Sequence, residues 1–259
     1  MKIAVCVKQV PDSETRINLP APAPQLDRSG FTRVLNPYDA YAVEQAVRIK
    51  ESREGVEVTA ITVGNQAVKE TLKKDCLAVG CDKAVIIDDP ALADADNAAI
   101  AAVLAAALKR DAYDLVLFGI KAIDGDSGQV GILVAELLGM AHVSTITKLE
   151  LGDGTLKAER EIEGGKEIVE ASLPCALTCQ KGLNEPRLPS LPNIMKAGMK
   201  PMETVTCADL GIAVPANLVN VKLYSPPPAR GACRLVEADD PAAAARELAR
   251  LLNEEAKVI

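Results

Sequence analysis

Short apolar runs that alternate with helix-length segments constrain the fold of this chain more than any other feature. Four of these runs cover residues 2–7, 56–63, 84–87 and 115–119, and a fifth begins near Val143. Strands separated by helical segments are typical of β-α-β units, whose strands lie parallel in one sheet. The sequence therefore predicts an α/β fold with a doubly wound, mostly parallel, Rossmann-like sheet covered by helices.

Helix start and stop signals lie between the apolar runs. Asn36 can cap a helix, Pro37 suits the first helical position, and Asp39 favours the positive end of the helix dipole. Gly80 and Gly139 each follow a periodic apolar segment and suit a left-handed helix stop. Four helices are predicted in this part of the chain: the first begins at Asn36, the second covers residues 67–79, the third runs from near Asp96 to Leu108, and the fourth from Ser127 to Leu138.

The pattern changes after the fifth apolar run. Residues 144–178 alternate between polar and apolar, with GDG at 152–154 and GG at 164–165 as turns. We expect them to form an antiparallel meander that extends the main sheet. Four prolines between residues 182 and 201 predict a loop, because proline sustains neither a helix interior nor a central strand.

The C-terminal fifth of the chain differs in composition from the rest. Residues 206–230 are irregular and include Pro226, Pro227 and Pro228, which is typical of an extended arm. An amphipathic helix is predicted at about 241–255, where it can dock on this body or on another chain. We therefore divide the chain into an α/β domain, residues 1–205, and a C-terminal arm and helix, residues 206–259.

Composition argues against several classes of function. The net charge of -7 disfavours general binding to nucleic acids or anionic membranes, since both need a positive field. No run approaches the length of about 20 apolar residues that spans a bilayer. The first ten residues enter a strand pattern without the features of a signal peptide. We expect no nucleic-acid partner, no direct membrane insertion and a cytoplasmic location.

The sequence offers no recognisable catalytic or metal-binding pattern. The single histidine, His142, has no nucleophile motif to act with, so we expect a surface or strand-edge residue. The seven cysteines match neither a paired zinc site nor a CxxC redox motif. We expect them to be reduced and mostly buried, where they behave as small hydrophobic residues.

The segment GIKAIDGDSGQVGILVAELLG, residues 119–139, is the most informative about binding. Open α/β sheets bind ligands beyond the carboxyl ends of their strands, where helix N-termini offer unpaired amide groups. Gly125, Gly128 and Gly131 would let a phosphate approach that backbone. A structural alternative stays open, in which Asp126 or Ser127 caps the helix and the glycines form a turn.

Residues 183–200, which we call the docking loop, combine positive charge with apolar side chains. The cations are Arg187, Lys196 and Lys200, and the apolar residues include Leu188, Leu191, Ile194 and Met195. An apolar anchor with a cationic rim is typical of a transient protein interface. The alternative is that these apolar side chains pack onto the main body.

Four motifs together resemble the electron-transfer flavoprotein beta subunit. They are VCVKQVPDSE, LNPYDAYAVEQAVRIKE, KAIDGDSGQVG and LNEPRLPSLPNIMKA, in this order, and the resemblance covers Met1 to about Val205. It implies a heterodimer with a larger alpha subunit, on which residues 206–259 would pack. FAD held mainly by the alpha subunit would accept electrons from acyl-CoA or related dehydrogenases. The chain would then be an electron-carrier subunit and not an enzyme in its own right.

The resemblance also implies that the chain buries an adenine nucleotide, usually AMP with a structural role. Carried over by position, the contacts would be Cys6, Asn36, Pro37, Tyr38, Asp39, Val63, Asp124, Gly125, Asp126, Ser127, Gly128, Gln129, Val130, Gly131, Ile132, Leu133, Val134 and Ala135. In the docking loop, Leu191 would insert into an apolar pocket of the dehydrogenase, with Arg187 and Lys196 also facing the partner.

Two alternatives to an AMP-holding carrier stay open. Some members of the family are electron-bifurcating: they oxidise NADH and hold a second FAD where others hold AMP. The start of the chain and DGDSGQVG resemble those members, whereas residues 93–103 and the docking loop favour AMP. An ATP-using adenylating enzyme would need a Ser-Gly-Gly-x-Asp-Ser loop after the first strand, where this chain has KQVPDSE. We expect AMP.

Overall fold

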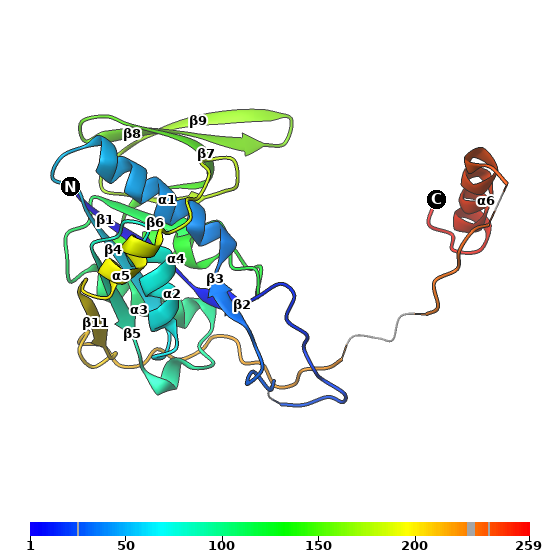
Figure 1. Cartoon of the computed structure of the whole chain (residues 1–259), viewed down its shortest axis with the longest axis horizontal. Helices are drawn as coiled ribbons and strands as arrows, with labels where there is room; N and C mark the ends of the chain where they lie inside the picture. The colour runs from blue at the N-terminus through cyan, green and yellow to red at the C-terminus, as the bar shows by residue number, and fades with distance from the viewer. Residues whose placement is uncertain (25, 227–230, 238) are drawn as a thin grey trace. The chain divides into compact units, whose positions relative to one another are not determined.

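A nine-stranded sheet forms the centre of the larger of two compact units (Figure 1). The computed structural model of the chain describes residues 1–24, 26–226, 231–237 and 239–259. The strand order is β11-β5-β4-β1-β6-β10-β7-β8-β9. The strands are β1 (Lys2–Cys6), β4 (Glu57–Val63), β5 (Lys83–Ile87), β6 (Leu115–Gly119), β7 (Ala141–Leu151), β8 (Thr155–Ile162), β9 (Gly165–Ser172), β10 (Cys175–Cys179) and β11 (Met202–Val205). All neighbours from β11 to β7 pair in parallel, which confirms the predicted fold class.

The antiparallel extension is confirmed for β7, β8 and β9 but not for β10. β8 pairs antiparallel with both β7 and β9, whereas β10 enters between β6 and β7 and lies parallel to both. Every residue of β10 is buried, and its sequence CALTC lacks the polar-apolar alternation of a half-exposed strand. Strands buried on both faces belong in the middle of a parallel sheet. The prediction that residues 175–178 belong to the meander is therefore wrong.

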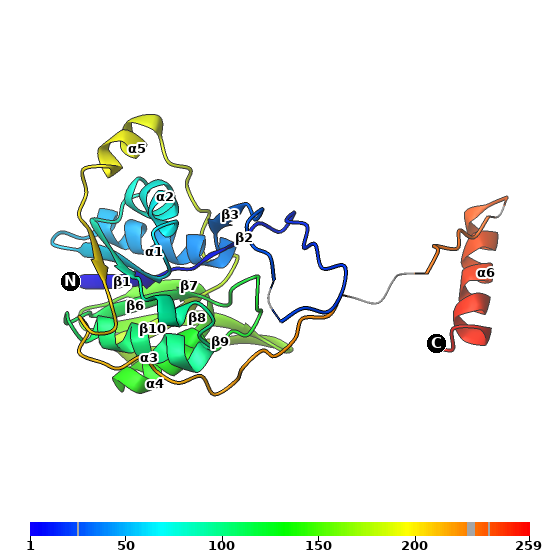
Figure 2. The same ribbon diagram turned by 90° about the horizontal axis from the view of Figure 1, so that it is seen from below.

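Helices cover both faces of the sheet, as the doubly wound prediction requires (Figure 2). The helices of this unit are α1 (Pro37–Ser52), α2 (Val68–Leu72), the π-helical turn η1 (Lys73–Leu77), the 3₁₀ turn η2 (Pro90–Leu92), α3 (Asn97–Leu108), α4 (Val130–Leu138) and α5 (Leu191–Ala197). Side chains of β1 alternate between the two sides, since Ile3 and Val5 join the core beneath α1 while Ala4 and Cys6 join the core beneath α3 and α4.

Two predicted helices and one predicted loop need correction. The segment 67–79 divides into α2 and η1 instead of one α-helix, although Gly80 does follow it. α4 begins at Val130 and not at Ser127. The stretch 182–201 contains α5, because Ser190 caps the helix and Pro192 occupies its first turn, where no intrahelical N–H bond is lost.

The smaller unit joins Leu19–Gln25 to Leu223–Ile259. Its helix α6 (Pro241–Glu254) confirms the predicted C-terminal helix, and Asp240 caps its first turn. The larger unit continues to Lys222, beyond the predicted boundary at residue 205. Pro227 and Pro228, part of the predicted arm, lie outside the described residues. None of the helices in the described ranges is long and apolar enough to cross a membrane.

Candidate nucleotide site and docking loop

The carboxyl ends of three neighbouring strands form one rim of the sheet. β4, β1 and β6 lie side by side and end at Val63, Cys6 and Gly119. The chain winds outward from β1 to β4 and β5, and then returns to place β6 on the other side of β1. Open α/β sheets bind ligands at such a reversal, because the loops on its two sides diverge and leave a crevice. The first, second and fourth apolar runs of the sequence therefore end at one rim.

Asp39, in the first turn of α1, ties the ends of β1 and β6 together. Its Oδ2 accepts a hydrogen bond from the Lys8 backbone N–H at 2.7 Å, and its Oδ1 accepts from the Gly119 N–H at 3.2 Å and from Asn36 Nδ2 at 2.8 Å. Burial raises the pKa of Asp39 to about 7, although these hydrogen bonds and the Lys8 charge act in the opposite direction. Both carboxylate oxygens of Asp39 accept hydrogen bonds from groups of this chain, so the side chain holds the ends of β1 and β6 and the start of α1 together.

Asn36 links the start of α1 to the loop that follows β6. Its Nδ2 also donates to the Lys121 carbonyl at 2.9 Å, and its Oδ1 accepts from the Ile123 N–H at 3.2 Å. Asn36 is buried, with 1% of its surface exposed, and it makes no side-chain cap to α1. The predicted capping role is therefore wrong, because the side chain is used to hold the loop.

Two ion pairs neutralise the carboxylates of this loop. Lys8 Nζ lies 2.8 Å from a carboxylate oxygen of Asp124, and Lys121 Nζ lies 2.8 Å from one of Asp126. Lys121 Nζ also lies 6.0 Å from the centre of the Tyr38 ring. The two carboxylates that would repel a phosphate therefore already have cationic partners, and each cation comes from the rim itself.

No side chain caps the N-terminus of α4. Its N-cap residue is Gln129, and neither Asp126 nor Ser127 accepts a hydrogen bond from the first turn. The capping part of the structural alternative is therefore wrong, whereas the left-handed conformation of Gly128 agrees with its glycine turn. In contrast, α3 is capped by Asp96. An α-helix leaves its first amide N–H groups without intrahelical partners, and the helix dipole favours an anion there. The amides at Val130 and beyond are therefore suited to a phosphate.

The glycines of the loop serve different purposes. Gly128 has a φ of 61°, the left-handed conformation that glycine adopts without strain. Gly131 lies inside α4, where an added Cβ would meet Thr178 Cγ2 at 3.0 Å and Phe118 Cγ at 3.1 Å. Close packing of α4 on the sheet therefore requires Gly131, whatever the ligand.

The remaining predicted contact residues are buried, half-buried or exposed, and the half-buried ones are Tyr38, Val63 and Val130. The side chains of Cys6, Val134 and Ala135 are buried in the core beneath α3 and α4. The exposed residues are Pro37, Gly125, Ser127, Gln129, Ile132 and Leu133. His142 is exposed on β7, as predicted. Within the described ranges, no group of three or more His, Cys, Asp or Glu residues could hold a metal ion.

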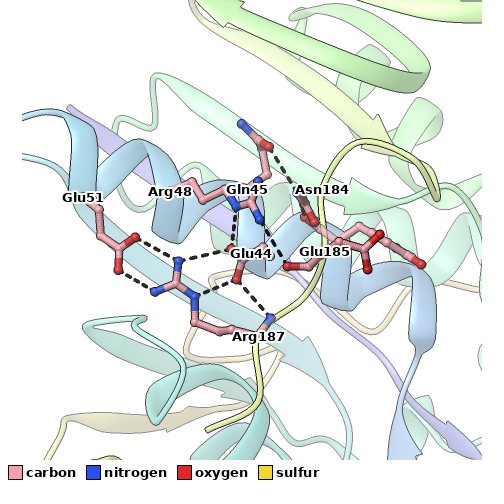
Figure 3. A network of polar contacts seen from close by, with 8 residues as sticks. Glu44, Gln45, Arg48, Glu51, Asn184, Glu185 and Arg187 are labelled. Carbon is pink, nitrogen blue, oxygen red and sulfur yellow. Dashed lines mark hydrogen bonds and ion pairs between the residues drawn. The ribbon is translucent and has the colours of Figure 1, made fainter.

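Arg187 joins the docking loop to α1 through two carboxylates (Figure 3). Its Nε donates to Glu44 Oε2 at 2.8 Å, its Nη2 donates to Glu44 Oε1 at 3.1 Å, and Nη2 also donates to Glu51 Oε2 at 2.9 Å. The Glu44 side chain is only 2% exposed and also accepts from Arg48 Nε at 2.6 Å. Burial raises the pKa of Glu44, but the hydrogen bonds from Arg187 and Arg48 outweigh it and hold the pKa below its usual value.

Further contacts hold the docking loop at each end. Asn184 Nδ2 donates to the Tyr41 carbonyl at 3.0 Å, and Lys200 Nζ donates to the Leu77 and Cys81 carbonyls at 2.8 Å and 2.6 Å. Burial lowers the pKa of Lys200. Between these contacts the apolar side chains project outward: the exposed fractions are 91% for Leu188, 78% for Leu191, 79% for Met195 and 82% for Met199. The alternative, in which the apolar side chains pack onto the body, holds for Leu183, Ile194 and Ala197.

Comparison with known proteins decides the family. The electron transfer flavoprotein domain model matches residues 25–210. The electron transfer flavoprotein subunit beta of Bacillus subtilis is 42% identical over 264 residues, which cover 100% of both chains. The chain belongs to the electron transfer flavoprotein family, as a beta subunit.

Other electron transfer flavoprotein relatives cover nearly the same length. The human subunit beta is 33% identical over 97% of this chain and 99% of its own. The subunit CarD of the caffeyl-CoA reductase-Etf complex of Acetobacterium woodii is 38% identical over 88% of both chains. Membership of the family implies a flavin in the complex and an alpha subunit as partner.

Three residues that shape the rim at the ends of β4, β1 and β6 were not predicted from the sequence. Lys8 and Lys121 were within recognised motifs but carried no pattern of their own, and only their ion pairs reveal their positions. Gly119 was assigned only as a strand end, whereas an added Cβ there would lie 2.3 Å from Asp39 Oδ1. Each of these roles depends on a contact between distant parts of the chain.

Proposed function

We propose that this beta subunit binds AMP as a structural nucleotide at the rim formed by β4, β1 and β6. The uncapped N-terminus of α4 carries the proposal, because its amides face no side-chain acceptor at the point where the winding of the sheet reverses. The loop between Asp124 and Gln129 would cover the phosphate, and Lys8 and Lys121 would offset the negative charges of Asp124 and Asp126. The nucleotide here supports the fold and takes no part in bond-making.

The test is a count of released ligands from the purified heterodimer. After denaturation, we expect one FAD and one AMP per heterodimer, identified by chromatography and absorbance. Two FAD molecules and no AMP would refute the AMP assignment. A heterodimer with one FAD and no second nucleotide would refute the site itself.

The alternative is a bifurcating subunit that holds a second FAD and oxidises NADH. The similarity to CarD, from a caffeyl-CoA reductase-Etf complex, favours this alternative. NADH-dependent reduction of a low-potential acceptor by the heterodimer would support it, together with the flavin count. Failure to oxidise NADH would contradict it.

We further propose that the docking loop binds acyl-CoA or related dehydrogenases, so that FAD held with the alpha subunit relays their electrons. Leu191 is exposed in this chain and can gain burial in a partner pocket. We expect Leu191→Ala to weaken coupling about ten- to a hundredfold, since burial of a Leu side chain stabilises by about 1.5 to 3 kcal/mol. The bound nucleotide should remain at full occupancy.

The assay is the rate at which a purified acyl-CoA dehydrogenase reduces the heterodimer flavin, measured against heterodimer concentration. Ile168→Ala is the matched control, because Ile168 is 59% exposed and lies on β9, outside both the docking loop and residues 206–259. Equal coupling in both variants would contradict the anchor role of Leu191.

Residues 206–259, including α6, would pack on the alpha subunit.

A further inference from the structure

The exposed part of the docking loop cannot order itself. α5 has seven residues, and isolated helices shorter than about 12 residues are marginal in water. Leu188 and Leu191 make few contacts with the body, since 91% and 78% of their surfaces are exposed. Because Ile194 and Ala197 pack α5 onto the core, the direction of Leu188 and of the residues that lead into α5 depends on the contacts at the start of the loop.

Arg187 supplies the strongest of these contacts. Its planar guanidinium bonds both oxygens of Glu44 and also Glu51, which lies about two turns further along α1 (Figure 3). Charge-assisted bonds in this fork geometry are strong and directional. Arg187 is the residue directly before Leu188, so fixing its side chain and its backbone N–H on Glu44 fixes the start of the apolar surface.

Most of the N–H groups of Arg187 already donate to carboxylates of this chain. Its Nε, Nη1 and Nη2 all donate to carboxylates of the same chain. A partner carboxylate would have to displace Glu44 or Glu51, and displacement of Glu44 would leave a buried charge with Arg48 alone. Lys196, exposed at the end of α5, is better placed to meet an acidic partner.

We propose that Arg187 is a positioning residue of the docking loop: its bonds to Glu44 and Glu51 orient Leu188 and Leu191 for an apolar pocket of the dehydrogenase, and it makes no bond to that partner. The proposal rests on the proposed docking function. It replaces the expectation of a cationic rim that includes Arg187. The partner is recognised by its apolar pocket, which meets a surface assembled before binding.

Glu51→Gln separates positioning from direct contact. Glu51 is on the exposed side of α1, with 55% of its side chain accessible, so the substitution leaves the core unchanged. If Arg187 positions the loop, weakening its Glu51 partner disorders the loop and weakens docking. If Arg187 binds the partner directly, releasing it from Glu51 leaves docking unchanged or strengthens it. Glu54→Gln, which removes the same charge from an exposed neighbour, is the control.

Two measurements on the intact heterodimer report the outcome. With an acyl-CoA dehydrogenase as electron donor, Glu51→Gln should raise the KM for the heterodimer by up to about fivefold at unchanged kcat, because an exposed ion pair contributes modestly and apparent affinity falls with the fraction of competent loop. Amide hydrogen exchange in residues 188–199 should accelerate, and Glu54→Gln should change neither quantity.

The outcomes distinguish this proposal from the docking function. A KM that stays unchanged in Glu51→Gln but rises in Leu191→Ala overturns the positioning role alone. A KM that stays unchanged in both variants overturns the docking function and the positioning role with it. A lower KM in Glu51→Gln would show that Arg187 meets the partner directly, and would also overturn the proposal.

Discussion

Replacement of Gly119 by alanine tests whether α1 and β6 meet as closely as the structure shows. The added Cβ would lie 2.3 Å from Asp39 Oδ1 and 2.8 Å from both the Asp39 backbone nitrogen and the Tyr38 carbonyl carbon. Favourable contacts of this kind lie at about 3.5 to 4.0 Å. Two of the three atoms belong to the backbone, so they cannot rotate away, and the start of α1 must move by about 1 Å.

The cost follows from that displacement. Overpacking of this kind destabilises by about 1 to 3 kcal/mol. The shift also weakens the bond from the Gly119 N–H to Asp39, and hydrogen bonds to charged groups contribute about 1.5 to 3 kcal/mol. We expect Gly119→Ala to lower the free energy of unfolding by about 3 to 5 kcal/mol, or the melting temperature by about 10 °C.

Circular dichroism melting at fixed protein concentration and scan rate provides the measurement. The control is Gly30→Ala, because nothing lies within 4 Å of a Cβ at Gly30 and its melting temperature should stay near that of the unmodified protein. A Gly119→Ala protein that melts with the control would refute the close approach. A drop in melting temperature without loss of bound nucleotide would refute the link between this contact and the rim.

Two further predictions concern buried ionisable groups. Because the pKa of Asp39 rises from 3.8 to about 7 on folding, the folded chain binds this proton more tightly, and the stability it contributes is lost as pH rises from about 4 through 7. Asp39→Asn should remove this pH-dependent loss of stability, which amounts to about 1.4 kcal/mol per unit of pKa shift. If the free energies of unfolding of the two proteins change in parallel between pH 4 and 7, the prediction is wrong. Iodoacetamide at neutral pH should label Cys233 alone in the folded protein, because the other six cysteines are buried. Burial also raises the pKa of Cys81 to about 12 and that of Cys175 to about 11, so these thiols are not deprotonated at neutral pH. Mass spectrometry of tryptic peptides measures the labelling, and a modified Cys6 would contradict it.

Local patterns made the main elements of the fold predictable. The apolar runs at the start of the chain became β1, β4, β5 and β6, and the capped segment after Asp96 became α3. Both depend on periodicities of a few residues, which the sequence carries directly. The family resemblance was also a property of the sequence, because its motifs keep their order whatever the chain folds into.

The position of β10 was not predictable from local pattern. Its five residues follow two hairpin strands in the sequence, and nothing in CALTC specifies the neighbour with which it pairs. In the structure β10 is completely buried, as a central strand is. It can pair between β6 and β7 only after the chain has folded and the edges of those two strands are close to it. Strand pairing is a long-range choice.

Short segments of the sequence already specify the mostly parallel α/β sheet and the glycine-rich loop after β6, because periodicity and glycine placement are local properties. Folding is needed to bring Asp39 to Gly119, 80 residues away, and Arg187 to Glu44, 143 residues away. The reason is physical: a carboxylate has the same composition wherever it lies. Its role depends on which donors the fold brings within hydrogen-bonding distance and on how far they exclude water.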